Sequence, residues 1–101
     1  MTAEQLKVRT KLYSLSIIDL VEKLPVTIAS KIVAYQIAKS GTSVGANYRA
    51  VCRARSDKEF IAKMEIVLEE ADETLFWLEI IIEKNWLTKS ITEPVWKEGN
   101  E

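Results

Sequence analysis

Apolar residues recur along this chain at steps of three and four, the spacing that places side chains on one face of an α-helix. β-type alternation is not sustained anywhere, and the chain has only three glycines and two prolines. Helices are therefore predicted over nearly the whole chain. The first is expected to end at Pro25, and its apolar face comprises Leu6, Tyr13, Ile17, Leu20 and Leu24.

A second helix is predicted to begin after Thr27, whose hydroxyl can cap a helix N-terminus. Its expected inner face mixes apolar and polar side chains: Val33, Ile37, Ser40, Val44, Asn47 and Val51. Glycine inside a helix costs about 1 kcal/mol relative to alanine, so the two glycines here indicate very close packing. We expect a stripe of small residues to form a tight helix contact, with the Asn47 amide hydrogen-bonded inside the bundle. The predicted packing residues are Ser40, Gly41, Gly45 and Asn47, with Ser43 and Ala46 beside them.

The third helix has the clearest pattern. Ser56 to Glu59 has the form of a capping box, in which the serine and glutamate side chains each bond a backbone amide of the other residue. An unbroken a/d repeat follows, made of Ile61, Met64, Leu68, Ala71, Leu75, Leu78 and Ile82. Phe60, Val67 and Ile81 widen this stripe, which suits the interior of a bundle better than a two-stranded coiled coil.

A fourth helix is predicted to open between Ser90 and Glu93, with Pro94 in its first turn. From Thr92 to Glu101 it would have fewer than about three turns, much less than its partners. The predicted fold is all-α: residues 1–101 form a single domain, an antiparallel up-and-down four-helix bundle with a short, truncated fourth helix.

The net charge of −1 conceals two opposed segments. Residues 27–58 carry six basic side chains and one acidic one, whereas residues 59–83 carry eight acidic side chains and one basic one. We name as the basic group Lys39, Arg49, Arg53, Arg55 and Lys58. These side chains could bind phosphates of a nucleic acid, or could form intramolecular or intersubunit ion pairs with Glu65, Asp72 and Glu79. Both interpretations stay open, and the opposite charge of adjacent segments favours ion pairing.

Catalytic chemistry is not indicated. The chain has no histidine, which removes the commonest general base and metal ligand. Cys52 is the only cysteine, so no intrachain disulfide can form, and we expect it to be a small buried or half-buried side chain. Carboxylates four residues apart, such as Glu65 and Glu69, could share a hard cation, but a solvated acidic face explains them more simply. We predict a non-enzyme with no catalytic residue, cofactor, metal or small-molecule substrate.

Side chains off the main stripe of the third helix point to self-association. Phe76, Trp77 and Ile80 make this helix apolar nearly all the way round, and the short fourth helix cannot cover them alone. Aromatic side chains are enriched in interface cores. We therefore predict an oligomer interface at Phe76, Trp77 and Ile80. No signal peptide or membrane span is evident, so we expect a cytoplasmic location and no membrane partner.

Three segments together resemble a known family: Ser40 to Arg49, Arg53 to Phe60, and Glu69 to Glu79. They are similar to the bacterial four-helix bundle proteins first noticed in intervening sequences of 23S rRNA genes. The similarity extends more weakly from Arg9 to Leu87. The chain departs from it at Ala50 and Val51, where many members have glutamate and glycine, and in its shorter fourth helix.

The resemblance implies a non-catalytic bundle that assembles into a ring, often a pentamer. A related accessory protein of diversity-generating retroelements forms a positively charged barrel that binds nucleic acid and a reverse transcriptase. Two functions therefore stay open for this chain. It is either an oligomeric scaffold whose basic group binds RNA or a nucleic-acid enzyme, or a structural or protein-binding bundle with no nucleic-acid role.

Overall fold

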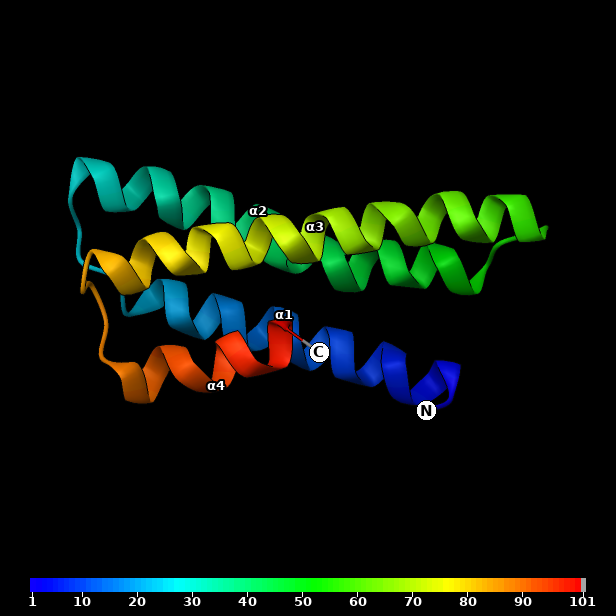
Figure 1. Ribbon diagram of the computed structural model, residues 1–101, viewed down its shortest axis with the longest axis horizontal. Helices are drawn as coiled ribbons and strands as arrows, with labels where there is room; N and C mark the ends of the chain where they lie inside the picture. Colours follow the sequence, from blue (N-terminus) through cyan, green and yellow to red (C-terminus); the bar gives the residue numbers. More distant parts are fainter. Residues whose placement is uncertain (101) are drawn as a thin grey trace.

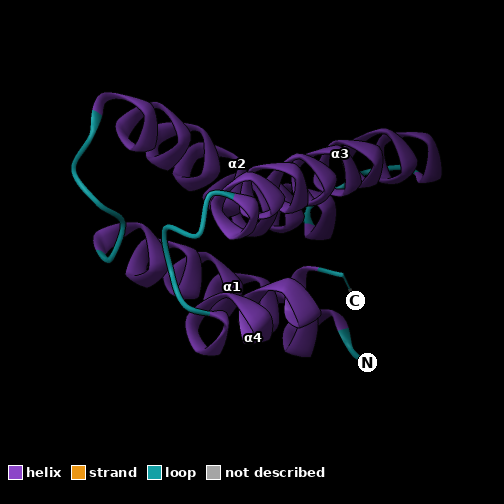
Figure 2. Cartoon of the chain, turned by 60° about the vertical axis from the view of Figure 1, so that its left-hand side comes forward, coloured by secondary structure: helices purple, strands orange, loops and turns teal. Residues whose placement is uncertain are grey.

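The computed structural model describes residues 1–100 as four helices without strands. α1 packs against α2 and α4, and α3 packs against the same two helices, so the four form an up-and-down bundle (Figures 1 and 2). The α2–α3 turn lies at the opposite end from the other two connections (Figure 1). The predicted all-α four-helix bundle is confirmed. The helices are α1 (Ala3–Glu22), α2 (Ile28–Cys52), α3 (Asp57–Glu83) and α4 (Lys89–Gly99).

Side-chain caps fix the starts of the three long helices. The Thr27 hydroxyl accepts from the backbone amide of Ser30 at 3.1 Å, which starts α2 at the predicted place. Ser56 accepts from the amide of Glu59, also at 3.1 Å, and starts α3. Only this half of the predicted capping box is present, because the Glu59 carboxylate pairs instead with Lys63 one turn later, at 3.3 Å. Each cap satisfies an amide that would otherwise lack a helical partner.

Two hydroxyl groups meet in the centre of the bundle. Ser40 on α2 and Thr74 on α3 are fully buried, and their oxygens lie 2.9 Å apart. Thr74 Oγ1 also lies 2.7 Å from the carbonyl oxygen of Glu70. Because both hydroxyls have partners, burying them avoids the cost of an unpaired polar group. The apolar core around them consists of Tyr13, Ile17, Leu20, Leu24, Val33, Ile37, Val44, Tyr48, Val51, Val67, Leu78, Ile81 and Val95.

The buried face of α3 differs from the predicted a/d stripe. Ile61 and Leu68 belong to that stripe, yet they are 58% and 60% exposed. The buried residues of α3 are Val67, Thr74, Leu78 and Ile81, so the inward face is rotated toward the side that carries Thr74. A threonine interrupts an apolar pattern, but here its hydroxyl is satisfied and it can lie inward. The predicted stripe is correct at Leu78, which is buried, and wrong at Ile61 and Leu68, because it did not include Thr74 in the inward face.

The fourth helix begins earlier than predicted. α4 starts at Lys89, its N-cap residue Thr88 makes no side-chain cap hydrogen bond, and Pro94 is its sixth residue rather than part of its first turn. α4 reaches as far as the level of Leu75, because a Cβ built on Gly99 would lie 3.0 Å from Leu75 Cδ2. The described part of the chain places no fourth helix beside the N-terminal half of α3, where Ile61 and Leu68 are exposed.

The small residues of α2 bring it close to α1. A Cβ built on Gly41 would lie 2.8 Å from two side-chain carbons of Ile17, and one built on Gly45 would lie 3.1 Å from Ser14 Oγ. The Ser14 hydroxyl donates to the carbonyl of Gly41 at 3.2 Å across this contact. Only a residue without a side chain permits this separation, so the helix-propensity cost of glycine is offset by packing.

Replacing Gly41 by alanine tests this close contact. Ile17 is fully buried and has no space into which to move, so Gly41→Ala is expected to destabilise the fold by about 1–3 kcal/mol. Chemical denaturation followed by circular dichroism measures the change. If the contact were loose, alanine's higher helix propensity would instead raise stability by up to about 1 kcal/mol.

An ion pair ties the end of α4 to α1. Arg9 donates from Nη2 to Glu98 Oε1 at 2.9 Å, and its Nε bonds the other carboxylate oxygen. This hydrogen bonding lowers the pKa of Glu98 below its usual value. Beneath the pair, burial and the charge of Glu98 raise the pKa of Tyr13 to about 12. Charge-assisted bidentate pairing of this kind fixes geometry as well as adding stability.

Glu98→Gln is expected to lower stability at neutral pH by less than about 1 kcal/mol, because both partners are partly exposed. A carboxylate with a lowered folded pKa stabilises the fold above its unfolded pKa, about 4.3, and loses that contribution as the pH falls further. The difference between the parent protein and Glu98→Gln should therefore shrink as the pH falls below about 4. Urea titrations at pH 7, 5 and 3 measure it, and a difference that grows toward low pH would contradict this assignment.

Candidate nucleic-acid interface

The basic group gathers mainly at the α2–α3 end of the bundle. Arg49 lies in the last turn of α2, Arg53 caps that helix, Arg55 lies in the turn and Lys58 lies in the first turn of α3. Lys39 stands apart, because ten residues of helix, about 15 Å, separate it from Arg49. All five side chains are exposed. The structure thus brings four of the five predicted residues to one end of the molecule.

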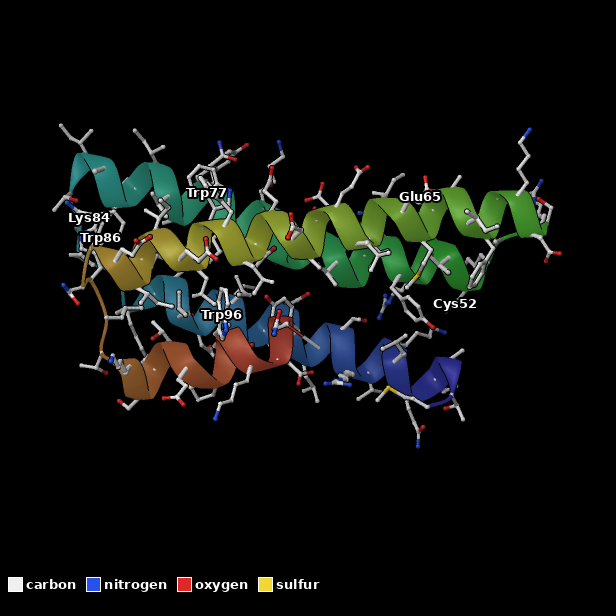
Figure 3. The ribbon with its side chains drawn as sticks, in the orientation of Figure 1. Cys52, Glu65, Trp77, Lys84, Trp86 and Trp96 are labelled. Atoms are coloured by element: carbon white, nitrogen blue, oxygen red, sulfur yellow. The ribbon has the colours of Figure 1, made fainter. Side chains whose placement is uncertain are left out.

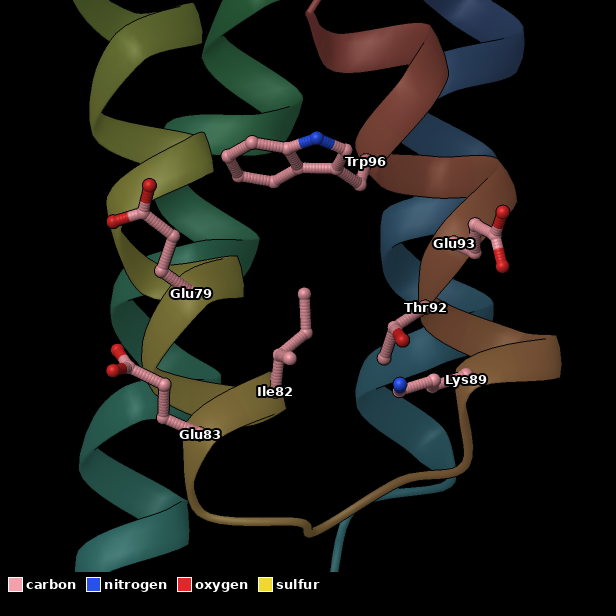
Figure 4. Close-up of a pocket in the computed structure, with 7 residues that line it drawn as sticks. All are labelled: Glu79, Ile82, Glu83, Lys89, Thr92, Glu93 and Trp96. Atoms are coloured by element: carbon pink, nitrogen blue, oxygen red, sulfur yellow. The ribbon is translucent and has the colours of Figure 1, made fainter.

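The ion pairs expected between the basic group and α3 are not present within residues 1–100. The pairs found there involve other side chains: Lys7 with Glu4, Arg9 with Glu98, Lys63 with Glu59, and Lys97 with Glu93. Glu65, Asp72 and Glu79 recur every seven residues and so share one side of α3. Glu79 lines the hollow between α3 and α4, with its carboxylate directed away from α4 (Figure 4). The intramolecular form of the expected pairing was therefore wrong, whereas pairing between subunits stays a prediction.

A hollow of about 430 Å³ lies beside the turn that carries the arginines. Its floor includes Tyr48 and Val51, which are buried, and Arg55, Ser56 and Phe60 line it from the turn and α3. Phe60 is 48% exposed. The sequence assigned Phe60 to the core stripe of α3, so this combination of an accessible aromatic ring and an arginine was not predicted. The sequence feature that could have indicated this combination is the position of Phe60, five residues after Arg55.

Cys52 also lines this hollow and is exposed, which corrects the expectation of a buried or half-buried thiol (Figure 3). Burial and a side-chain hydrogen bond with Cys52 raise the pKa of Tyr48. Neither group has a histidine partner, since the chain contains none, so no nucleophile and base pair is assembled here.

A second hollow, of about 620 Å³, lies between α3 and α4. The Trp96 indole extends from α4 across it toward α3, and Glu79 and Glu83 lie on the α3 side, with Ile82 between α3 and α4 (Figure 4). Lys89, Thr92 and Glu93 complete its lining. In the described chain no group of three or more histidine, cysteine, aspartate or glutamate side chains is arranged to hold a metal ion. The exposed carboxylates of α3 include Glu65, Glu69, Asp72, Glu73 and Glu79.

The predicted packing residues occupy different environments. Ser40 and Gly41 are buried and Gly45 is half-buried at the α1–α2 contact. The Asn47 side chain differs from expectation: it is half-buried, and its amide donates to the carbonyl of Ser43 in the same helix at 2.8 Å. Ala46 is exposed, so the close-packed stripe is narrower than the sequence suggested.

The predicted oligomer interface is only partly accessible. Phe76 is 52% exposed and packs edge to face on Trp77, with ring centroids 5.0 Å apart. Trp77 and Ile80 are half-buried against the core. The Trp77 indole nitrogen is buried and has no hydrogen-bond partner among the described residues. Phe76 is therefore the member of this set best placed to meet another molecule.

Comparison with known proteins places this geometry in context. No curated protein matches the chain. A crystal structure of a protein of unknown function from the S23 ribosomal protein family of Bacteroides thetaiotaomicron VPI-5482 is 31% identical, with a TM-score of 0.87. The similarity covers 99% of this chain and 89% of that one. Across the described helices, none is both long and apolar enough to cross a membrane. The family described as 23S rRNA-intervening sequence protein matches residues 4–101, and the chain belongs to that family.

Proposed function

We propose that this protein is a non-enzymatic RNA-binding scaffold that uses the basic group to hold phosphates. The observation that carries this proposal is the set of four exposed cationic side chains at the α2–α3 turn, none of which forms an ion pair with a described residue. Guanidinium groups bind phosphate oxygens through two parallel hydrogen bonds, and three of these four residues are arginines.

The electrostatic argument depends on the separation of charge along the bundle. The overall charge of −1 would give no attraction to a polyanion if it were spread evenly. Instead, the excess negative charge lies along α3 and the positive charge is concentrated at one end. RNA phosphates that contact this end would release condensed counterions, which supplies sequence-independent affinity. The family's description, with its reference to 23S rRNA intervening sequences, is compatible with this ligand.

Self-association is the second part of the proposal. The bundle exposes large apolar side chains that a monomer would leave in water, among them Phe76 on α3 and Val8, Leu12 and Leu15 along one side of α1. A homo-oligomer, a pentamer by family resemblance, would cover such faces and would repeat the basic group around a ring. Repetition of a weak phosphate site raises affinity for a long polyanion without any new contact. A cytoplasmic location is compatible with both RNA binding and self-association.

The alternative function is a structural or protein-binding bundle without a nucleic-acid role. The exposed apolar faces favour it equally, since they would suit a protein partner as well as a second copy. A nucleic-acid enzyme that binds the basic group would instead belong with the scaffold function. Binding of naked RNA separates the two functions.

Charge reversal of Arg49 and Arg53 together should abolish retention of RNA at low salt, because it replaces two phosphate-binding groups by carboxylates that repel the backbone. Lys11→Glu with Lys31→Glu is the matched control: both lysines are exposed on other parts of the bundle, and the net charge changes equally. Electrophoretic mobility shift and circular dichroism measure binding and helicity. Absence of RNA binding by the parent protein at low salt would overturn the proposed function.

Phe76→Glu should reduce the mass of the protein in solution if Phe76 lies in the subunit interface, because it places an unpaired charge in an apolar contact. Val26→Glu, at an 81% exposed position in the α1–α2 connection, is the control. Multi-angle light scattering at micromolar concentration measures the mass. A parent protein that is monomeric under these conditions would contradict self-association.

A further inference from the structure

We infer that the hollow beside the α2–α3 turn receives an unpaired base of single-stranded RNA, while the adjacent arginines hold the flanking phosphates. This inference rests on the proposed function and adds the class of RNA that the basic group selects. It is carried by the juxtaposition of Phe60, a half-exposed aromatic ring, with Arg55 at the rim of the same hollow.

The hollow has the size and lining of a small-ligand site. At about 430 Å³ it falls within the range of about 300–1,000 Å³ that is typical of such sites. Its buried floor is apolar, formed by Val51 and the ring of Tyr48, and Phe60 supplies an accessible flat face. A nucleobase likewise has two apolar faces, and stacking on an aromatic ring is the usual way in which proteins hold unpaired bases.

Polar groups around the rim match the edge of a base. Ser56 and Asp57 carry oxygen atoms that can accept hydrogen bonds from base amino groups, whereas Arg55 can donate to ring nitrogens, carbonyls or phosphate. The Ser56 hydroxyl already accepts from the amide of Glu59, so its remaining role would be that of a donor or second acceptor. The carboxylate of Asp57 disfavours a phosphate inside the hollow, which leaves the phosphates to Arg53 and Lys58 outside it.

Duplex RNA does not fit this arrangement. Bases within a helix are stacked on one another, and the deep, narrow major groove of A-form RNA admits no side chain such as Phe60. A site built from phosphate contacts alone would favour the duplex, because a duplex carries more phosphates per unit length than a single strand. A stacking site instead binds the single strand more tightly.

The test compares a single-stranded RNA dodecamer with the duplex of the same sequence, at one fixed low salt concentration, by fluorescence anisotropy. The single strand should bind on the order of tenfold more tightly. Phe60→Leu should remove most of this difference while leaving the salt dependence unchanged, and Phe60→Tyr should retain it, because stacking is worth about 1–3 kcal/mol per base. Tyr35→Leu is the matched control, since it removes an exposed aromatic ring from α2 outside both the hollow and the proposed subunit interface.

Alkylation of Cys52 gives an independent readout. It is the only cysteine, it is exposed and it lines the hollow, so bound single-stranded RNA should slow its reaction with N-ethylmaleimide and duplex RNA should not. Equal binding of single strand and duplex, or a Phe60→Leu variant that binds like the parent protein while the Arg49 and Arg53 double variant does not, would overturn the inference and leave the proposed function standing. Failure of the parent protein to bind either RNA would overturn both.

Discussion

The hydrogen bond between Ser40 and Thr74 sets the orientation of α3, and much of the surface follows from it. Two fully buried hydroxyls can satisfy each other only if Thr74 faces α2. Turning Thr74 inward rotates the inner face of α3 toward Val67 and Ile81 and turns Ile61 and Leu68 outward. Close approach of α1 and α2 at Gly41 completes this centre, because it brings the buried Ile17 side chain of α1 against the backbone of α2.

The same rotation determines the electrostatics of the bundle. Glu79 lines the hollow between α3 and α4, and no described carboxylate forms an ion pair with Arg49, Arg53 or Arg55. Arg49, Arg53 and Arg55 are left exposed at the turn, beside a hollow with an aromatic wall. An arrangement that merely stabilised the bundle would have paired these charges. These arginines lie at one end of the bundle, away from the ion pair of Arg9 with Glu98. The charged contact that stabilises the fold is therefore separate from the charged surface that is available to a ligand.

The sequence predicted helix starts well where a cap residue acts locally, as at Thr27 and Ser56, and it identified the α2 glycines as positions of close approach. The sequence did not predict other features that depend on contacts between helices. The burial of Thr74 depends on a partner 34 positions away, and the exposure of Cys52 depends on how the end of α2 meets the turn. The basic group was identified from composition and spacing. The absence of ion pairs between this group and α3 could not be predicted, because it depends on the rotation of α3 in the bundle.

The salt dependence of RNA affinity tests the central claim, that the α2–α3 end of the bundle binds phosphates through exposed, unpaired arginines and a lysine. Four phosphate contacts to single-stranded RNA predict that log K falls with log salt with a slope of about −3. Fluorescence anisotropy between about 50 and 200 mM salt would measure this slope. A slope near zero, or no binding at the lowest salt concentration, would contradict the account.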